Sequence, residues 1–382
     1  MSADAATGGD GVDLTYGDLR VRVLGDRGHL QWLEEFLTPH FGRRAGEPDC
    51  QVFVNEDEEQ FAALRLSGPH ADSGLLDCFA LDSSVVRLPV WRASEGTTTI
   101  FDEKFDVFYS LNADDPRTVT LITRRHNLGA RVAMMRVVRE LTMNHVQRIG
   151  GLFLHAAALA VRGRGVVIAG QRAAGKTTLL IHLLRHAGAR YVSNDRALVS
   201  FHPATVALRG MPTIVTVRPR TLALFPSLRE RLLASGYHPR LSLAEVAAAP
   251  LQTPRPWGDQ RFGLSPAQFR ALLATEAVAD CQLSTLLLPR ITNQPGTVRL
   301  TELSPEVAAE RLSLALFGAG SWRKSSDVFT VPDEPPPPDE TELARRCSRL
   351  TSQVRCVECA LGLEAYERAE LAGELLDEVL AA

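Results

Sequence analysis

The residues best suited to chemistry lie in one glycine-bounded segment that ends in a lysine and a hydroxyl. Two glycines at this spacing let the backbone bend so that consecutive N–H groups face an anion. The lysine can reach the β- and γ-phosphates of a nucleotide, and the hydroxyl after it is a ligand for Mg²⁺. The segment predicts a nucleotide-phosphate loop that runs into a helix and consists of Gly170, Gln171, Arg172, Ala173, Ala174, Gly175, Lys176, Thr177 and Thr178.

The residues on either side of this loop favour the same interpretation. The β-branched run 166–168 before the loop is typical of a buried strand, and leucines at helical spacing follow it. A helix from Lys176 to about His186 would present its positive N-terminus to the bound anion. Because lysine occurs only at positions 104, 176 and 324, a chance match is on the order of one in several hundred.

An aspartate follows the next expected strand, residues 191–193. Phosphate-loop folds supply a carboxylate for Mg²⁺ at such a strand end, and Asp195 occupies that position. The alternative is a turn aspartate that caps the strand exit. Thr177 and Asp195 are therefore the predicted magnesium ligands.

His155 lies in the apolar segment 152–161, which a glycine-rich turn separates from a second apolar segment, 166–169. This pattern predicts a β-hairpin. If Arg162 pairs with Gly165, His155 lies opposite Arg172 inside the loop, and a register change of one or two residues still leaves His155 beside the nucleotide. The two alternatives for His155 are a catalytic or substrate-orienting residue and a hydrogen-bonded core histidine.

Three other residues have types that can do chemistry. Arg209 precedes a glycine at an expected strand exit, where it could neutralise transferring phosphoryl charge, although most arginines in so arginine-rich a chain are solvated. Cys356 and Cys359 have metal or redox spacing but no second pair. On the strand expected there, residues three apart face opposite sides, which favours a structural role for both cysteines.

Together these motifs resemble the HPr kinase/phosphorylase superfamily, in which a histidine strand, a hairpin, the phosphate loop, a helix and an acidic pair with a following arginine occur in this order. The corresponding residues are 154–156, 170–177 and 194–196, and Arg209 with Gly210 is similar to a later arginine–glycine segment. The chain looks most like the HPr-kinase-related kinases of uncharacterised substrate. The resemblance implies an α/β fold with a phosphate-loop kinase core on a mixed sheet and a smaller N-terminal α/β domain.

The resemblance also implies an activity: ATP- and Mg²⁺-dependent transfer of the γ-phosphoryl group to a hydroxyl of a protein, peptide or small-molecule acceptor. Its catalytic residues would be Asp195, His155, Lys176 and Arg209, and its cofactors ATP and Mg²⁺.

Two departures from the family pattern modify this expectation. Asn194 replaces the first acidic residue, thought to be the general base, and Ala207 replaces a glutamate before the arginine–glycine pair, so HPr is not the expected acceptor. A carboxamide takes no proton at neutral pH. Either Asp195 or His155 then transfers the proton, or attack proceeds without a strong base. The alternatives are an ATP-binding regulatory protein with weakened or lost catalysis and an ATP hydrolase coupled to a partner.

The elements that must position these residues fall into an N-terminal and a C-terminal region. Residues 1–13 are expected to be a disordered leader and residues 14–150 a small α/β domain. Strands are expected at 19–24, 51–54, 75–81, 85–90, 105–111 and 119–123, and helices at 28–41 and 128–149.

The kinase domain is expected at 151–331, with strands and turns at 206–224 and 281–303 and a Pro- and Arg-rich segment, 250–263, long enough for a mobile loop. The prolines of 332–338 predict a stiff spacer. Residues 339–382 are then expected to pack on the core as a helix (340–352), a strand (354–360) and a helix (364–380).

Composition excludes several classes of protein. The 382 residues are 45% hydrophobic and 23% charged, typical of a globular chain with two domains at roughly 150 residues each. A formal net charge of -3 gives no basic field for nucleic acid. No apolar run reaches the ~18 residues of a spanning helix, so no membrane association is expected. Six scattered cysteines and no signal peptide in residues 1–13 predict a cytoplasmic protein with reduced thiols; a homo-oligomer remains open.

Overall fold

The computed structural model describes residues 10–68, 73–79, 85–92, 96–171, 173–186, 188–235, 262–320, 323–324 and 328–381. The chain divides into unit 1 (Met1–His145 and Lys324–Pro336) and unit 2 (Val146–Arg323 and Pro337–Ala382). The sequence predicts a division near residue 150 and a spacer from residue 332. The observed division instead falls inside a helix, and residues 324–331 belong to unit 1.

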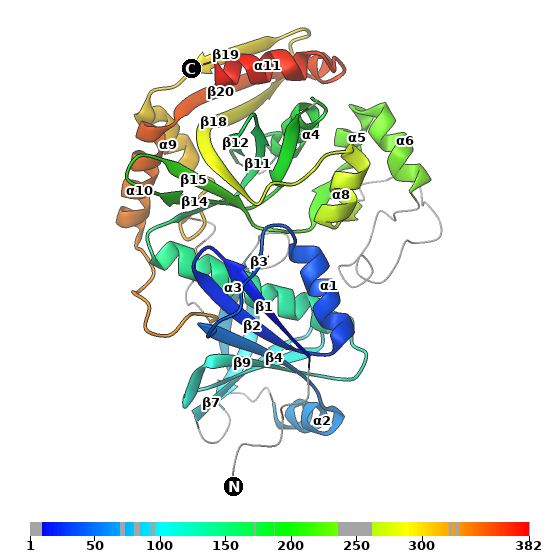
Figure 1. The fold of residues 1–382 in the computed structure, drawn as a ribbon, viewed down its shortest axis with the longest axis vertical. Helices are drawn as coiled ribbons and strands as arrows, with labels where there is room; N and C mark the ends of the chain where they lie inside the picture. Colours follow the sequence, from blue (N-terminus) through cyan, green and yellow to red (C-terminus); the bar gives the residue numbers. More distant parts are fainter. Residues whose placement is uncertain are drawn as a thin grey trace. The chain divides into compact units, whose positions relative to one another are not determined.

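Unit 1 is built on a mixed sheet with the strand order β3-β1-β2-β4-β9-β8-β7-β6-β5 (Figure 1). β4 is parallel to β2 and β9, and the other neighbours are antiparallel. The strands are β1 (Asp10–Tyr16), β2 (Leu19–Gly25), β3 (Gly42–Arg43), β4 (Cys50–Glu56), β5 (Gly74–Phe79), β6 (Val85–Arg92), β7 (Thr97–Asp102), β8 (Val107–Asn112) and β9 (Asp115–Thr123). The helices are α1 (Arg27–Leu37), α2 (Glu58–Ser67) and α3 (Gly129–Arg148).

Unit 1 differs from the sequence expectation in several places. Residues 10–13, expected in the leader, pair with β2 as the first half of β1, whereas residues 1–9 of the expected leader lie outside the described residues. α1 ends at Leu37, because Pro39 has no N–H to continue the helix and restricts the residue before it. β1, β3, β7 and α2 were not predicted; in α2 only Phe61 is buried.

Buried polar contacts explain why residues 324–336 belong to unit 1. The Nζ of Lys324 donates to Oε2 of Glu140 on α3 at 2.7 Å, and both side chains are at most 5% exposed. The side-chain amide of Asn144 donates to the carbonyl oxygen of Phe329 at 2.5 Å. The sequence has no signal for these contacts, because they join residues about 185 positions apart.

Unit 2 contains a second mixed sheet with the strand order β10-β14-β15-β18-β12-β11-β13, and β20 and β19 continue it beside β18. β18 is parallel to both β12 and β20. The strands of this sheet are β10 (Leu152–Leu154), β11 (Ala156–Val161), β12 (Arg164–Ala169), β13 (Ala189–Ser193), β14 (Ala197–Phe201), β15 (Val206–Gly210), β18 (Asp280–Thr292), β19 (Val298–Glu302) and β20 (Arg355–Gly362). A separate pair joins β16 (Val215–Val217) to β17 (Phe262–Leu264). The helices are α4 (Lys176–Leu184), α5 (Pro219–Ala223), α6 (Pro226–Ala234), α8 (Pro266–Leu273), α9 (Pro305–Ser313), α10 (Glu340–Gln353), η3 (Leu363–Tyr366) and α11 (Leu371–Leu380). Both units are therefore α/β, as predicted; the resemblance implies a mixed sheet for the C-terminal domain, and both units contain one.

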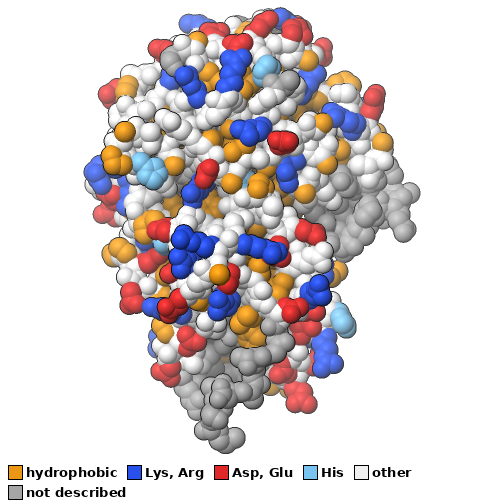
Figure 2. Space-filling view, in the orientation of Figure 1, with side chains coloured by type: hydrophobic (Ala, Val, Ile, Leu, Met, Phe, Trp, Pro, Cys, Tyr) orange, Lys and Arg blue, Asp and Glu red, His pale blue; other side chains and the backbone are white. Residues whose placement is uncertain are grey.

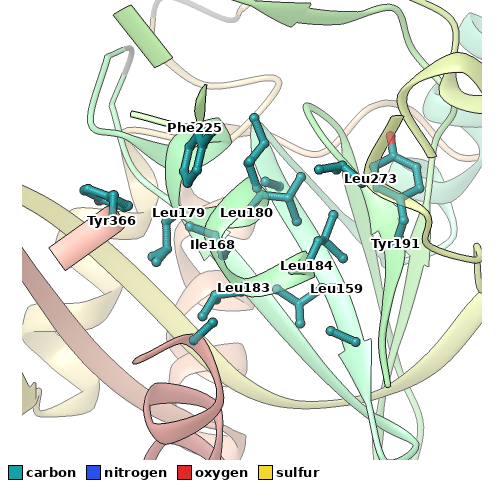
Figure 3. Packing of buried hydrophobic residues seen from close by; sticks show 14 of the residues in the cluster. Leu159, Ile168, Leu179, Leu180, Leu183, Leu184, Tyr191, Phe225, Leu273 and Tyr366 are labelled. Carbon is teal, nitrogen blue, oxygen red and sulfur yellow. The ribbon is translucent and has the colours of Figure 1, made fainter. Parts of the chain in front are cut away.

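α4 packs on one face of the second sheet through its leucines. Leu180 and Leu183 lie in a buried cluster with Ile168 of β12, as Figure 3 shows. Val167 points to a second cluster on the opposite face, which contains residues of α9 and α10. β12 is thus covered on both faces, which explains its continuous apolar run and makes its end a rigid base for the following loop.

Cys356 and Cys359 of β20 belong to these two different clusters, so the prediction that they face opposite sides of the sheet is confirmed. Burial raises the pKa of Cys356 to about 11. Burial, with smaller contributions from Glu378 and Glu358, raises the pKa of Cys359 to about 12. Both thiols are therefore protonated near neutral pH and act as small apolar groups.

The hairpin before the phosphate loop has a different register from the one expected. Val161 pairs with Arg164, so Arg162 and Gly163 form a two-residue turn with φ values of 53° and 79°. Two positive φ values are typical of the type I′ turn, which matches the twist of the strands. The expected pairing of Arg162 with Gly165 is wrong by two residues. The last pair is Ala156 with Ala169, and His155 lies just beyond it.

The C-terminal segment enters the sheet instead of only packing on it, because β20 pairs with β18 from Thr285–Arg355 to Thr292–Gly362. The helix expected at 364–380 is divided into η3 and α11. The carbonyl oxygen of Tyr366 accepts a hydrogen bond from Arg185 at 3.1 Å, where a continuous helix would use the amide of residue 370. The expected loop 250–263 lies outside the described residues up to position 261, and its last two residues belong to β17.

The surface carries both signs of charge. On the face shown in Figure 2, Lys and Arg side chains are interspersed with Asp and Glu, in keeping with the formal net charge of -3. Among the described residues, no helix has the length and apolar character needed to cross a membrane.

Candidate functional site

The predicted phosphate loop leaves the carboxyl end of β12 and enters α4, in the middle of the sheet of unit 2. Gly175 is the residue before α4 and has a φ of 96°. A Cβ at this position would lie 2.8 Å from Cδ1 of Ile291 on β18. The backbone conformation therefore favours glycine here, and any side chain would also displace that of Ile291.

Lys176, the first residue of α4, is buried and turned back over its own loop. Its Nζ donates to the carbonyl oxygens of Gly170 at 2.8 Å and Gln171 at 3.1 Å. Burial lowers the pKa of Lys176 to about 8, and the nearby charge of Asp195 partly opposes this shift. Near neutral pH the ammonium group remains mostly charged, in an environment that disfavours charge.

The two threonines after Lys176 differ in their surroundings. Thr178 is buried, and its Oγ1 lies 3.3 Å from Oγ1 of Thr221 on α5. Thr177 is half-buried, and Gln171 and Ala173 in the loop are exposed. Thr178 therefore fixes α4 to α5, which leaves Thr177 as the hydroxyl with access to solvent. Arg172 lies outside the described residues.

His155 and Asp195, which the sequence placed near the loop by separate arguments, contact each other. The Nε2 of His155 lies 3.0 Å from Oδ1 of Asp195. The backbone also joins the two segments, since Ala156 N–H donates to the carbonyl oxygen of Asp195 at 3.0 Å. Asp195 lies two residues beyond the end of β13, and its charge acts on Lys176. Lys176, Asp195 and His155 therefore form one electrostatic cluster.

The turn that carries Asp195 is held by its first residue. Ser193 Oγ donates to the carbonyl oxygen of Arg196 at 2.6 Å, and the Arg196 N–H lies 3.2 Å from the same hydroxyl oxygen. Asn194 is 6% exposed, and its Oδ1 has no hydrogen-bond partner among the described residues. This buried amide oxygen is able to accept a hydrogen bond but not a proton.

Sequence reasoning missed the role of Arg196 at this site. Its side chain is 1% exposed, its guanidinium carbon lies 5.3 Å from the ring centroid of Phe317, and its Nε lies 3.7 Å from Oδ2 of Asp195. Asp195 is thus bounded by an imidazole on one oxygen and a buried guanidinium near the other. The signal in the sequence is an arginine between an aspartate and the apolar run 197–199, where a charged side chain needs a buried partner.

Arg209 lies in different surroundings from the other predicted catalytic residues. Its Nη2 donates to Oδ2 of Asp280 at 3.4 Å, and both side chains are at least 35% exposed. The two residues line a cavity of about 320 Å³ with residues of the β14–β15 turn, β15 and the start of β18. The ion pair with Asp280 and the strand pairing of β15 thus join Arg209 to β18.

The site offers oxygen ligands of the kind that Mg²⁺ prefers. The described residues contain no group of three or more His, Cys, Asp and Glu side chains able to hold a metal ion by themselves. A Mg²⁺ ion bound with a nucleotide needs only one or two protein ligands, because phosphate and water oxygens complete its shell. The hydroxyl of Thr177 and the carboxylate of Asp195, whose side chain is 21% exposed, fit that requirement.

Comparisons with known proteins assign no family. No protein-family model matches this sequence, and no curated protein matches it either.

Proposed function

We propose that this chain is an ATP- and Mg²⁺-dependent phosphotransferase that transfers the γ-phosphoryl group to a hydroxyl of a protein, peptide or small-molecule acceptor. The observation that carries the proposal is the buried ammonium of Lys176 at the end of a glycine-bounded loop, beside the carboxylate of Asp195. A buried cation whose nearest partners are neutral carbonyls gains most from an anionic ligand. The N–H groups at the start of α4 favour the same ligand.

Each residue of the cluster has a role that follows from its chemistry. Lys176 and the loop N–H groups would hold the phosphates, and Thr177 with Asp195 would hold Mg²⁺. When bound, this ion supplies charge neutralisation for the transferring phosphoryl group. Arg196 would hold the Asp195 carboxylate in place, because its buried guanidinium lies 3.7 Å from Oδ2.

The proton of the acceptor hydroxyl needs a different route from the one an acidic pair would provide. Asn194 cannot accept it, whereas His155 and Asp195 share a contact of 3.0 Å. Either of these two residues would accept the proton, or the hydroxyl would attack with its proton still bound, as a loose transition state permits. His155 would in either case orient the carboxylate of Asp195.

A second function, ATP binding without efficient transfer, is favoured by one specific observation. The residue next to Asp195 is a buried asparagine whose Oδ1 has no partner among the described residues, so the place of a first acidic residue is taken by a group without basicity. In this alternative the chain would use bound ATP to regulate a partner.

Two substitutions distinguish these functions. Asp195→Asn removes the magnesium ligand and the local base, so phosphoryl transfer in cell extract with labelled ATP should fall by about a hundredfold or more. Asn194→Asp places a second carboxylate beside Asp195; in a working kinase, like-charge repulsion should keep turnover from rising. An active parent that is silenced by Asp195→Asn supports the kinase. A silent parent that Asn194→Asp activates contradicts it and supports the regulatory protein.

A further inference from the structure

The first strand of unit 1 has an edge that only part of the sheet covers. β1 pairs with β2 along its whole length, from Asp10–Gly25 to Tyr16–Leu19. On its other side it pairs only with β3, at Leu14 and Thr15. Residues 10–13 of β1 therefore have no neighbouring strand on that side among the described residues.

The register determines which backbone groups face this edge. The two-residue turn after Tyr16 makes Tyr16 and Leu19 a hydrogen-bonded pair, and such pairs alternate along an antiparallel ladder. Val12 consequently bonds to β2, whereas Gly11 and Asp13 direct their N–H and C=O groups to the open side. These are strong hydrogen-bonding groups, and a second strand would satisfy them.

A groove runs beside this edge. It has a volume of about 660 Å³, and its lining comprises residues 10–13 of β1, Arg43 of β3 with residues 44–45 after it, and one face of α1. The α1 residues in the lining are spaced as i, i+3, i+4 and i+7: Arg27, Leu30, Gln31 and Glu34. Extended peptides bind other proteins by adding a strand to an exposed sheet edge of this kind.

The charge of the groove selects the kind of peptide. Among its arginines, Arg43 forms an ion pair with Glu34, and the described contacts give Arg27 and Arg44 no partner. Of the aspartates in the lining, Asp13 is paired with Arg22. This leaves two exposed guanidinium groups against one unpaired carboxylate, that of Asp10. Acidic side chains on an added strand would complement the two guanidinium groups.

We propose that this groove binds an extended acidic segment of a partner protein, which adds to β1 as a further strand. The backbone of Gly11 and Asp13 would provide the ladder, and Arg27 and Arg44 would select acidic side chains. This interaction does not depend on the proposed phosphoryl transfer, because every residue it uses belongs to unit 1.

The test uses the full chain and three synthetic peptides with a fluorescent label. The first alternates acidic and β-branched residues (TEVEVDVT), the second replaces each acid by lysine, and the third is the first with N-methyl groups on alternate amides. Fluorescence anisotropy measures affinity, and hydrogen exchange measures protection of residues 10–13. We expect saturable binding of the first peptide only, with slower exchange in this segment.

Charge reversal then locates the site. Arg27→Glu with Arg44→Glu should weaken binding of the acidic peptide by about tenfold or more. Arg92→Glu, a charge reversal at an exposed residue of β6 outside the groove, is the matched control and should leave affinity unchanged. The proposal is overturned if the acidic peptide does not bind, if the lysine or N-methylated peptide binds equally well, or if the double variant retains the parent affinity with an unchanged Tm.

Discussion

At the scale of single residues, the candidate site places charged groups where water is scarce. Lys176 is 8% exposed, and its nearest partners are two carbonyl oxygens of its own loop. Asp195 lies between His155 and Arg196. Such charges interact more strongly than surface charges, because less water screens them. A bound phosphate would therefore gain more from Lys176 than from an exposed lysine.

The buried His182 of α4 makes the stability of the protein depend on pH. His182 is fully buried, and burial together with the charge of Arg185 lowers its pKa from 6.5 to about 4. A backbone hydrogen bond with Tyr366 and the charge of Glu370 only partly oppose this shift. The unfolded chain binds a proton below about pH 6.5 while the folded chain does not, so stability is lost as the pH falls through this window. Between about pH 7 and pH 5 this residue should account for a loss of roughly 2 kcal/mol in the free energy of unfolding. Urea denaturation of the parent and of His182→Leu at both pH values checks it, and an equal pH dependence in the two proteins would contradict it.

At the scale of elements, the loop depends on its contact with β18. Gly175→Ala would introduce a side chain at a φ of 96° and bring its Cβ to 2.8 Å from Ile291 Cδ1. We expect a loss of about 2 kcal/mol in stability and weaker nucleotide binding. Gly163→Ala is the control, because it introduces a side chain at a φ of 79° with no atom within 4 Å of the added Cβ. It therefore measures the backbone strain without the contact with Ile291. If both variants unfold at the same temperature, β18 does not restrict the loop.

Elements with local signals were predicted well, and those set by distant contacts were not. The strand before the loop and the helix after it carry their own apolar patterns, and both were confirmed. The predicted register of the hairpin was wrong by two residues because Arg162 adopts a positive φ. A positive φ is not expected for an arginine. β7 was missed although its run of threonines, Ile100 and Phe101 is a local strand signal, whereas the break before α11 involves a contact with the distant Arg185. The sequence predicted that His155 and Asp195 each lie near the phosphate loop, but not that they contact each other. Strand spacing places residues near each other but does not specify side-chain contacts.

At the scale of the whole molecule, the chain returns to unit 1 at a point in the sequence that follows most of unit 2. Lys324–Pro336 crosses back to residues of α3. The amino-acid composition along the chain predicted two domains, but residues 324–331 were assigned to the second domain and the prolines that follow to a spacer. The correct assignment rests on a buried ion pair, and no pattern along the chain marks which lysine will pair with which glutamate.

Removal of one partner of this pair should be costly. Lys324→Met leaves the buried Glu140 without its cationic partner, with the N–H of Phe79 still bonded to its Oε1. We expect a loss of about 3 kcal/mol in the free energy of unfolding. Lys324→Met combined with Glu140→Met should lose less than the single variant, because no unpaired charge remains. Thermal unfolding of the three proteins measures this, and additive losses in the double variant would contradict the importance of the pair.

The central claim, that residues 170–177 bind the phosphates of ATP through Lys176, is tested most directly by calorimetry. Mg·ATP is titrated into the parent, into Lys176→Ala and into Lys104→Ala, which removes an exposed lysine of unit 1. The account predicts that the parent and Lys104→Ala bind with the same affinity, whereas Lys176→Ala loses about a hundredfold or more in affinity with an unchanged circular dichroism spectrum. Equal affinity of Lys176→Ala and the parent, or no binding by the parent, would contradict the account.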